Sequence, residues 1–275
     1  MQLNEVFSKL KQLPVVPALL AELMESFGDD NARIDVLAKK IAMDQSLSAK
    51  VIKMANSAAY RRGKEVTSIE QAVIRLGFNT MRSIVIASGI SSAFPATPGF
   101  DKNKFWSDTF RVATIAKALA KHTTVEPETA FTCAMMHNIG EILLQSSLPE
   151  EMALVNMSMN QGASRIEAER EVLGFDYSQV GVELARRWNF SATFINAIEQ
   201  QLDPLSFEEV SAEAILIRLS VFVNFAWNAG VPAAAIVGRF PKALAEHLSI
   251  NPESLASQLD ELQHQGNELA MSLGH

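Results

Sequence analysis

Apolar residues recur in this sequence at the spacing of an α-helix along almost its whole length. Leu47, Val51, Met54 and Ala58 lie at positions i, i+4, i+7 and i+11, which places them on one helix face. No run alternates strictly between apolar and polar residues for long enough to form a strand. Because such a chain can bury its apolar faces only by packing helix against helix, we predict an all-α protein.

Several short segments have the composition of helix ends. Gly77 is suited to end a helix, because glycine readily adopts the backbone angles found there. Four segments fit helix starts, three as capping boxes and one as an N-cap followed by proline: Thr67-x-x-Glu70, Ser164-x-x-Glu167, Ser206-x-x-Glu209 and Asn251-Pro252. We therefore expect a helix to begin at each of these four segments.

The clearest interruption of the helical pattern lies at residues 94–99. This segment contains Pro95, Pro98 and Gly99, and no helix continues through such a sequence. The chain has 275 residues, of which 48% are hydrophobic, so it can bury a large core. We predict an N-terminal helical subdomain at residues 1–94, a second helical subdomain at 100–250 and a solvated helical tail at 251–275.

Charge and composition narrow the classes of partner. The net charge of −7 argues against nucleic acid, which requires clustered Lys and Arg. The most apolar stretches are too short or carry Arg218 and Asn224, so we expect no membrane segment. The first thirteen residues include charges and lack the apolar core of a signal peptide. With a single cysteine, Cys133, which we expect to be a core thiol, these features predict a cytoplasmic protein.

Several motifs together identify a family. Those in the first 80 residues are Leu13-Pro14-x-x-Pro17, Ile41-x-x-Asp44-x-x-Leu47, Ala55-Asn56-Ser57-Ala58-x-Tyr60 and Val66-Thr67-Ser68-Ile69-x-x-Ala72-x-x-x-Leu76-Gly77. Later ones are Phe105-Trp106, residues 135–144, Gly181-x-x-Leu184-x-x-x-Trp188-Asn189 and Ala197-Ile198. With them the chain resembles the HDOD (HD-related output domain) family over roughly residues 6–230. This is a bacterial signalling module related to HD-type metal-dependent phosphohydrolases. The resemblance implies a multi-helical N-terminal bundle packed on an HD-like helical half.

The resemblance also implies where the metal ligands of an active HD enzyme would fall. The His-Asp pair falls at His137 and Asn138, and the other ligand positions fall at Asp108, Tyr177, Gln200, Gln201 and Ser220. A lysine that often follows the Ile-Gly of the family falls at Glu141. Asn138 offers a neutral oxygen in place of the carboxylate that hard cations prefer. A single imidazole does not hold a metal that needs three or four ligands. We therefore expect a degenerate site with no catalytic residues, no metal and no cofactor.

Two alternatives remain open at these positions. His137 and Glu141 are four residues apart, so with Asp108 they could form a rearranged single-metal site. We favour the simpler interpretation, in which His137 is a hydrogen-bonded core residue and Glu141 is paired or solvated. A vacated cleft could also bind a nucleotide or other metabolite through the amides of Asn138, Gln200 and Gln201.

The N-terminal half contains the strongest local cluster of positive charge, formed by Arg61, Arg62 and Lys64. This cluster could contact an acidic partner surface or a phosphate, or it could be a solvated loop. We expect Asn56, just before it, to bond loop backbone groups. From the resemblance and the lost ligand positions, we expect a non-catalytic signalling module that contacts other signalling proteins.

Overall fold

The computed structural model of the chain describes residues 3, 6–7, 19, 22–23, 34–57, 60, 63–94, 97 and 99–272. All regular elements in these residues are helical, with no strand among them, which confirms the all-α prediction. The N-terminal helices are α3 (Ile34–Met43), α4 (Gln45–Ala55), α5 (Ile69–Leu76) and α6 (Phe78–Ala93). The central helices are α7 (Lys102–Ala120), α8 (Pro127–Met136), α9 (Ile139–Ser147), α10 (Pro149–Asn160), α11 (Arg165–Leu173), α12 (Tyr177–Arg187) and α13 (Ala192–Gln200). The last are η1 (Pro204–Ser206), α14 (Ala212–Asn228), α15 (Ala233–Gly238), α16 (Lys242–His247), α17 (Glu253–Ala256) and α18 (Leu259–Ser272).

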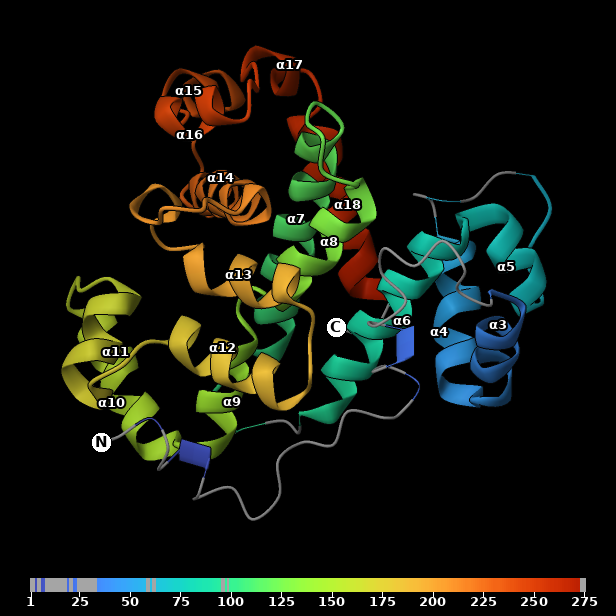
Figure 1. Cartoon of the computed structure of the whole chain (residues 1–275), viewed down its shortest axis with the longest axis horizontal. Coiled ribbons are helices and arrows are strands. Elements are labelled where there is room, and N and C mark those ends of the chain that lie inside the picture. Colours follow the sequence, from blue (N-terminus) through green and yellow to red (C-terminus); the bar gives the residue numbers. More distant parts are fainter. Residues whose placement is uncertain are drawn as a thin grey trace.

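The helices are arranged around a central pair, α7 and α8 (Figure 1). Helices α3, α4 and α5 pack together at one end, and α6 joins this group to α8. Helices α9 to α12 lie on the other side of the central pair, and α14 crosses α7 above them in the view of Figure 1. In the described part of the chain, no helix is both long and apolar enough to cross a membrane.

The apolar side chains form two buried clusters that meet along α7. The larger contains residues from α3 to α14 and from the end of α18, including Phe110 of α7, and also the single cysteine, Cys133. The smaller lies beneath α14 to α18 and includes Leu119 of α7. The larger cluster contains residues from both sides of the connection at 94–99, so the two sides share one core. The division into subdomains at 1–94, 100–250 and 251–275 therefore stays a prediction.

Several of the predicted helix ends are confirmed. Ser164 and Glu167 form a reciprocal capping box, with N–O distances of 3.3 Å from Glu167 N to Ser164 Oγ and 2.9 Å in return. Gly77 ends α5 with a φ of 77°, a conformation that favours glycine. The side chain of Asn251 accepts a hydrogen bond of 3.0 Å from the amide of Glu253, but the N-cap of α17 is Pro252, one residue later than predicted.

Two predicted helix starts were wrong by a few residues. Ser68, and not Thr67, caps α5, and its hydroxyl accepts from the amide of Gln71 at 3.3 Å. Ser206 ends the short η1 turn, whereas α14 begins after Ser211, whose hydroxyl accepts from a backbone amide. Both errors have one cause, since nearby Ser and Thr residues offer equivalent caps and packing decides which one is used.

Helix α18 corrects the expectation of a solvated tail. Its apolar stripe is buried: Leu259, Leu262, Leu269 and Ala270. The helix runs back along α7 and reaches α4 (Figure 1). An ideal Cβ at Gly266 would lie 2.7 Å from Cγ of Arg111, so the contact with α7 is close. Lys53 of α4 donates to the carbonyl of Met271 at 3.2 Å. The expectation was wrong because α18 is mostly polar, although its few apolar residues recur at helical spacing on one face.

Candidate functional site

His137 ends α8 and lies buried where that helix meets α9. Its Nδ1 lies 2.6 Å from the carbonyl oxygen of Ala134, so Nδ1 carries the proton and donates it. Burial lowers the pKa of His137 to about 4, against smaller opposing effects from the hydrogen bond to Ala134 and the charge of Asp108. The imidazole is therefore neutral at pH 7, with its lone pair on Nε2.

Asn138, next in the chain, is also buried and faces α7. Its Nδ2 donates to the hydroxyl of Thr109 at 2.8 Å. Its Oδ1 is buried and makes no hydrogen bond to any described residue. An unsatisfied buried carbonyl is a weak neutral acceptor, so Asn138 contributes packing and one hydrogen bond and no charge.

Tyr177 and Gln201 meet the backbone of His137. Gln201 Nε2 donates to the carbonyl of His137 at 2.7 Å and to that of Ile198 at 3.0 Å. The hydroxyl of Tyr177 lies 3.4 Å from Gln201 Oε1 and donates to it. Three positions predicted from the family resemblance are thus brought together. They form a hydrogen-bonded contact that joins the end of α8 to α12 and to the end of α13.

Gln200 and Ser220 have local partners of their own. The side chain of Gln200 donates to the carbonyl of Glu209 at 3.0 Å and accepts from the amide of Ser211 at 2.7 Å. It therefore fixes the loop before α14. The hydroxyl of Ser220 donates to the carbonyl of Leu216, one turn earlier in the same helix, at 2.7 Å. Neither side chain bonds to His137.

Asp108 of α7 is surrounded by donors. Lys104 forms an ion pair with it at 2.8 Å, and Arg111 forms a second. The amides of Asn224 and Asn228 donate to the same carboxylate at 3.2 Å and 2.9 Å. Burial would raise the pKa of Asp108, but these hydrogen bonds outweigh it and hold the pKa below its ordinary value. Asp108 is therefore an ionised carboxylate that anchors α14 to α7.

Glu141 belongs to a second network, which the sequence analysis missed. Arg165 forms ion pairs with Glu141 at 3.0 Å and with Glu169 at 3.6 Å. Glu169 accepts from the amide of Tyr177 at 2.7 Å. Burial raises the pKa of Glu169 to about 7, although Arg165 opposes the shift. Arg165 and Glu169 are four residues apart on α11, and this spacing was the available signal in the sequence.

The arrangement does not fit a divalent metal. In the described part of the chain, no three His, Cys, Asp or Glu side chains lie together as ligands would. Asp108 and Glu141 each have cationic partners within the protein. The rearranged ligand set of Asp108, His137 and Glu141 is therefore not assembled.

The predicted basic cluster is described only at Lys64. Its side chain is exposed, and its carbonyl accepts a hydrogen bond from Arg75. Arg61 and Arg62 lie outside the described residues. Asn56 pairs through both side-chain atoms with the backbone of Val66, each at 2.8 Å, which confirms that it serves the loop.

The all-helical arrangement of the described residues is shared with solved structures of other proteins. A crystal structure of a "putative phosphohydrolase" from Shewanella amazonensis SB2B matches with a TM-score of 0.84 and 33% identity, covering 98% of both chains. The HDOD domain family matches residues 13–204, and this chain belongs to that family.

Two further relatives are more distant. The structure of an HDOD domain protein with unknown function from Geobacter sulfurreducens has a TM-score of 0.84 at 20% identity, covering 97% of this chain and 96% of the other. An uncharacterized protein of Treponema pallidum (strain Nichols) is 24% identical over 204 residues. That match covers 70% of this chain but only 38% of the Treponema protein, so the chain spans well under half of that relative.

Proposed function

We propose that this chain is a non-catalytic signal-transduction module of the cytoplasm, which acts through contacts with other signalling proteins. The observation that carries the proposal is that both acids of the alternative ligand set, Asp108 and Glu141, already have cationic partners. Asp108 bonds to Arg111, and Glu141 is paired with Arg165. Such a site holds helices together, and it presents no open ligand set to a metal.

The energetics support the same proposal. Each hydrogen bond to a charged group contributes about 1.5–3 kcal/mol, and Asp108 accepts from four side chains. A metal would have to replace several of these bonds and would leave Arg111 partly buried without its carboxylate. His137 alone could supply only one ligand.

The test measures bound metal and hydrolysis together. Tag-free protein, purified without chelator and soaked in Mn²⁺, Fe²⁺, Zn²⁺ or Mg²⁺, is analysed by elemental mass spectrometry and assayed with bis-p-nitrophenyl phosphate. We expect no stoichiometric metal and no hydrolysis. A partner captured by the wild-type protein should be captured equally by His137→Ala. The control is His247→Ala, because His247 is exposed and distant in sequence.

The alternative is a metal-dependent phosphohydrolase with the ligands Asp108, His137 and Glu141. The name of the Shewanella protein favours it, since that chain is 33% identical. One metal per chain, lost in His137→Ala and Glu141→Gln but kept in His247→Ala, would establish this alternative and refute the first proposal.

A nucleotide or metabolite bound in the vacated cleft is less well supported. The amides that would contact it are engaged within the protein. Asn138 donates to Thr109, Gln200 to the carbonyl of Glu209, and Gln201 to the carbonyl of His137.

A further inference from the structure

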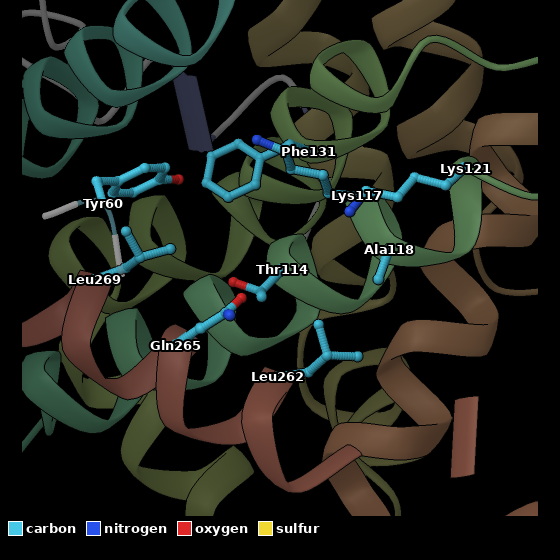
Figure 2. Close-up of a pocket in the computed structure, with 9 residues that line it drawn as sticks. All are labelled: Tyr60, Thr114, Lys117, Ala118, Lys121, Phe131, Leu262, Gln265 and Leu269. Atoms are coloured by element: carbon cyan, nitrogen blue, oxygen red, sulfur yellow. The ribbon is translucent and has the colours of Figure 1, made fainter. Parts of the chain in front are cut away.

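A cavity of about 220 Å³ lies away from His137, where three parts of the chain meet. Helix α7 forms its floor, α18 forms one wall, and Tyr60 and Phe131 close the opposite side (Figure 2). We call it the α7–α18 pocket and define it by its lining: Tyr60, Thr114, Lys117, Ala118, Lys121, Phe131, Leu262, Gln265 and Leu269. It joins the N-terminal half, the central helices and the C-terminal helix.

One end of the α7–α18 pocket is positively charged. Lys117 and Lys121 project from successive turns of α7 (Figure 2). The ammonium group of Lys117 pairs with the buried carboxylate of Glu128, which also accepts from Thr80 at 2.6 Å. Lys121 is exposed and has no ion-pair partner among the described residues. Two cations and one anion leave this end with a net positive charge.

The other end of the α7–α18 pocket is apolar and aromatic. The rings of Tyr60 and Phe131 lie near each other, and Leu269 closes the space beside Tyr60 (Figure 2). Burial raises the pKa of Tyr60, so its hydroxyl is neutral at pH 7. That hydroxyl lines the pocket and, being neutral, can donate a hydrogen bond to a ligand.

Two polar side chains lie between these ends. Thr114 and Gln265 point toward each other across the pocket (Figure 2). The hydroxyl of Thr114 donates to the carbonyl of Phe110 at 2.8 Å, and the amide nitrogen of Gln265 donates to Glu261 at 2.7 Å. The oxygens of Thr114 and Gln265 therefore remain available as acceptors in the middle of the pocket.

We propose that the α7–α18 pocket binds a small organic anion with a flat apolar body. The acidic group contacts Lys121 beside the Lys117–Glu128 pair, and the flat body lies against Tyr60, Phe131 and Leu269. The volume is below the range of about 300–1,000 Å³ typical of drug-sized ligands, so the ligand is small. This proposal goes beyond the signalling function and does not depend on whether His137 takes part in catalysis.

The test uses benzoate and phenyl phosphate as anionic probes and benzamide as the uncharged counterpart. Binding is measured by isothermal titration calorimetry and by the shift in melting temperature, because a ligand of the folded state raises apparent stability. We expect one or both acids to bind saturably at millimolar concentration or below, and benzamide to bind at least several-fold more weakly.

Three variants locate the binding. Lys121→Gln should weaken binding of the acid about tenfold, the lower end of the contribution of a charge-assisted hydrogen bond. Lys242→Gln, which removes the same charge from an exposed position on α16, should bind as the wild type does. Ala118→Leu, which fills the pocket, should abolish binding. Failure of both acids to bind, equal binding of benzamide, or unchanged binding by Lys121→Gln would overturn the proposal.

Discussion

Gly140, three residues after His137, is predicted to be required for the close packing of α9 against α12. An ideal Cβ at this position would lie 2.0 Å from the carbonyl oxygen of Tyr177 and 2.6 Å from the amide nitrogen of Gly181. Ordinary contacts begin at 3.4 Å, so Gly140→Ala forces α9 and α12 apart by more than about 1 Å. The opposing atoms belong to the backbone, and no rotamer change relieves the contact.

The magnitude follows from two opposing effects. Overpacking typically costs about 1–3 kcal/mol, and we expect the upper end, about 3 kcal/mol, because the opposing atoms are backbone atoms. Alanine gains about 1 kcal/mol over glycine within a helix. We therefore expect Gly140→Ala to lower the free energy of unfolding by about 2 kcal/mol, measured by urea denaturation with circular dichroism. The melting temperature should fall by about 4–8 °C.

The matched control is Gly238→Ala at the end of α15. A Cβ there meets nothing within 4 Å, so the same substitution should leave stability unchanged or raise it by up to about 1 kcal/mol. If the free energy of unfolding of Gly140→Ala lies within about 0.5 kcal/mol of the wild-type value, the close approach of α9 and α12 is refuted. The glycine would then need an explanation other than helix packing.

Gln201→Leu removes the side-chain donor from the carbonyl of His137 and should cost about 1–3 kcal/mol in urea denaturation; an unchanged midpoint would contradict the network. The ¹⁵N signals of His137 should show a proton on Nδ1 at pH 7 and should titrate near pH 4. The unfolded chain takes up this proton near pH 6.5, so the contribution of His137 to the free energy of unfolding is lost as the pH falls from 6.5 to 4. A titration midpoint near pH 6.5 would refute the burial of the imidazole. Gly266→Ala should speed amide hydrogen exchange across α18, because its Cβ would lie 2.8 Å from Cα of Arg111; unchanged exchange would exclude the close contact.

The all-α fold was predictable because the helical spacing of apolar residues can be read from short segments of the sequence. Leu47, Val51 and Met54 are buried as the pattern indicated. The capping box at Ser164 was recognisable because both partners lie within one turn. The cap of α14 was not, because Ser206 with Glu209 fits the capping-box pattern and Ser211 does not, yet the helix begins after Ser211.

Of the candidate positions that the resemblance implied, Gln201 bonds to the backbone of His137 and Tyr177 bonds to Gln201, whereas Gln200 and Ser220 bond elsewhere. The resemblance placed Tyr177, Gln201 and His137 together, and the structure joins them. The partners of Asp108 on α14 are more than a hundred residues away in sequence, and no local pattern announces such pairs. The spacing of Arg165 and Glu169 was a local signal, but the pairing of Arg165 with Glu141 crosses from α11 to α9 and has no local pattern.

The packing of α18 on α7 also sets an order of events during synthesis. α7 ends at Ala120 and α18 begins at Leu259, so about 140 residues separate them. At about 5–20 residues per second, the ribosome takes roughly 7–28 s to cover that length. Throughout this interval the face of α7 around Arg111 has no covering helix. A nascent chain with exposed apolar surface is prone to aggregate, so substitutions in α18 should reduce the soluble yield of newly made protein by more than their effect on unfolding of the finished molecule would imply.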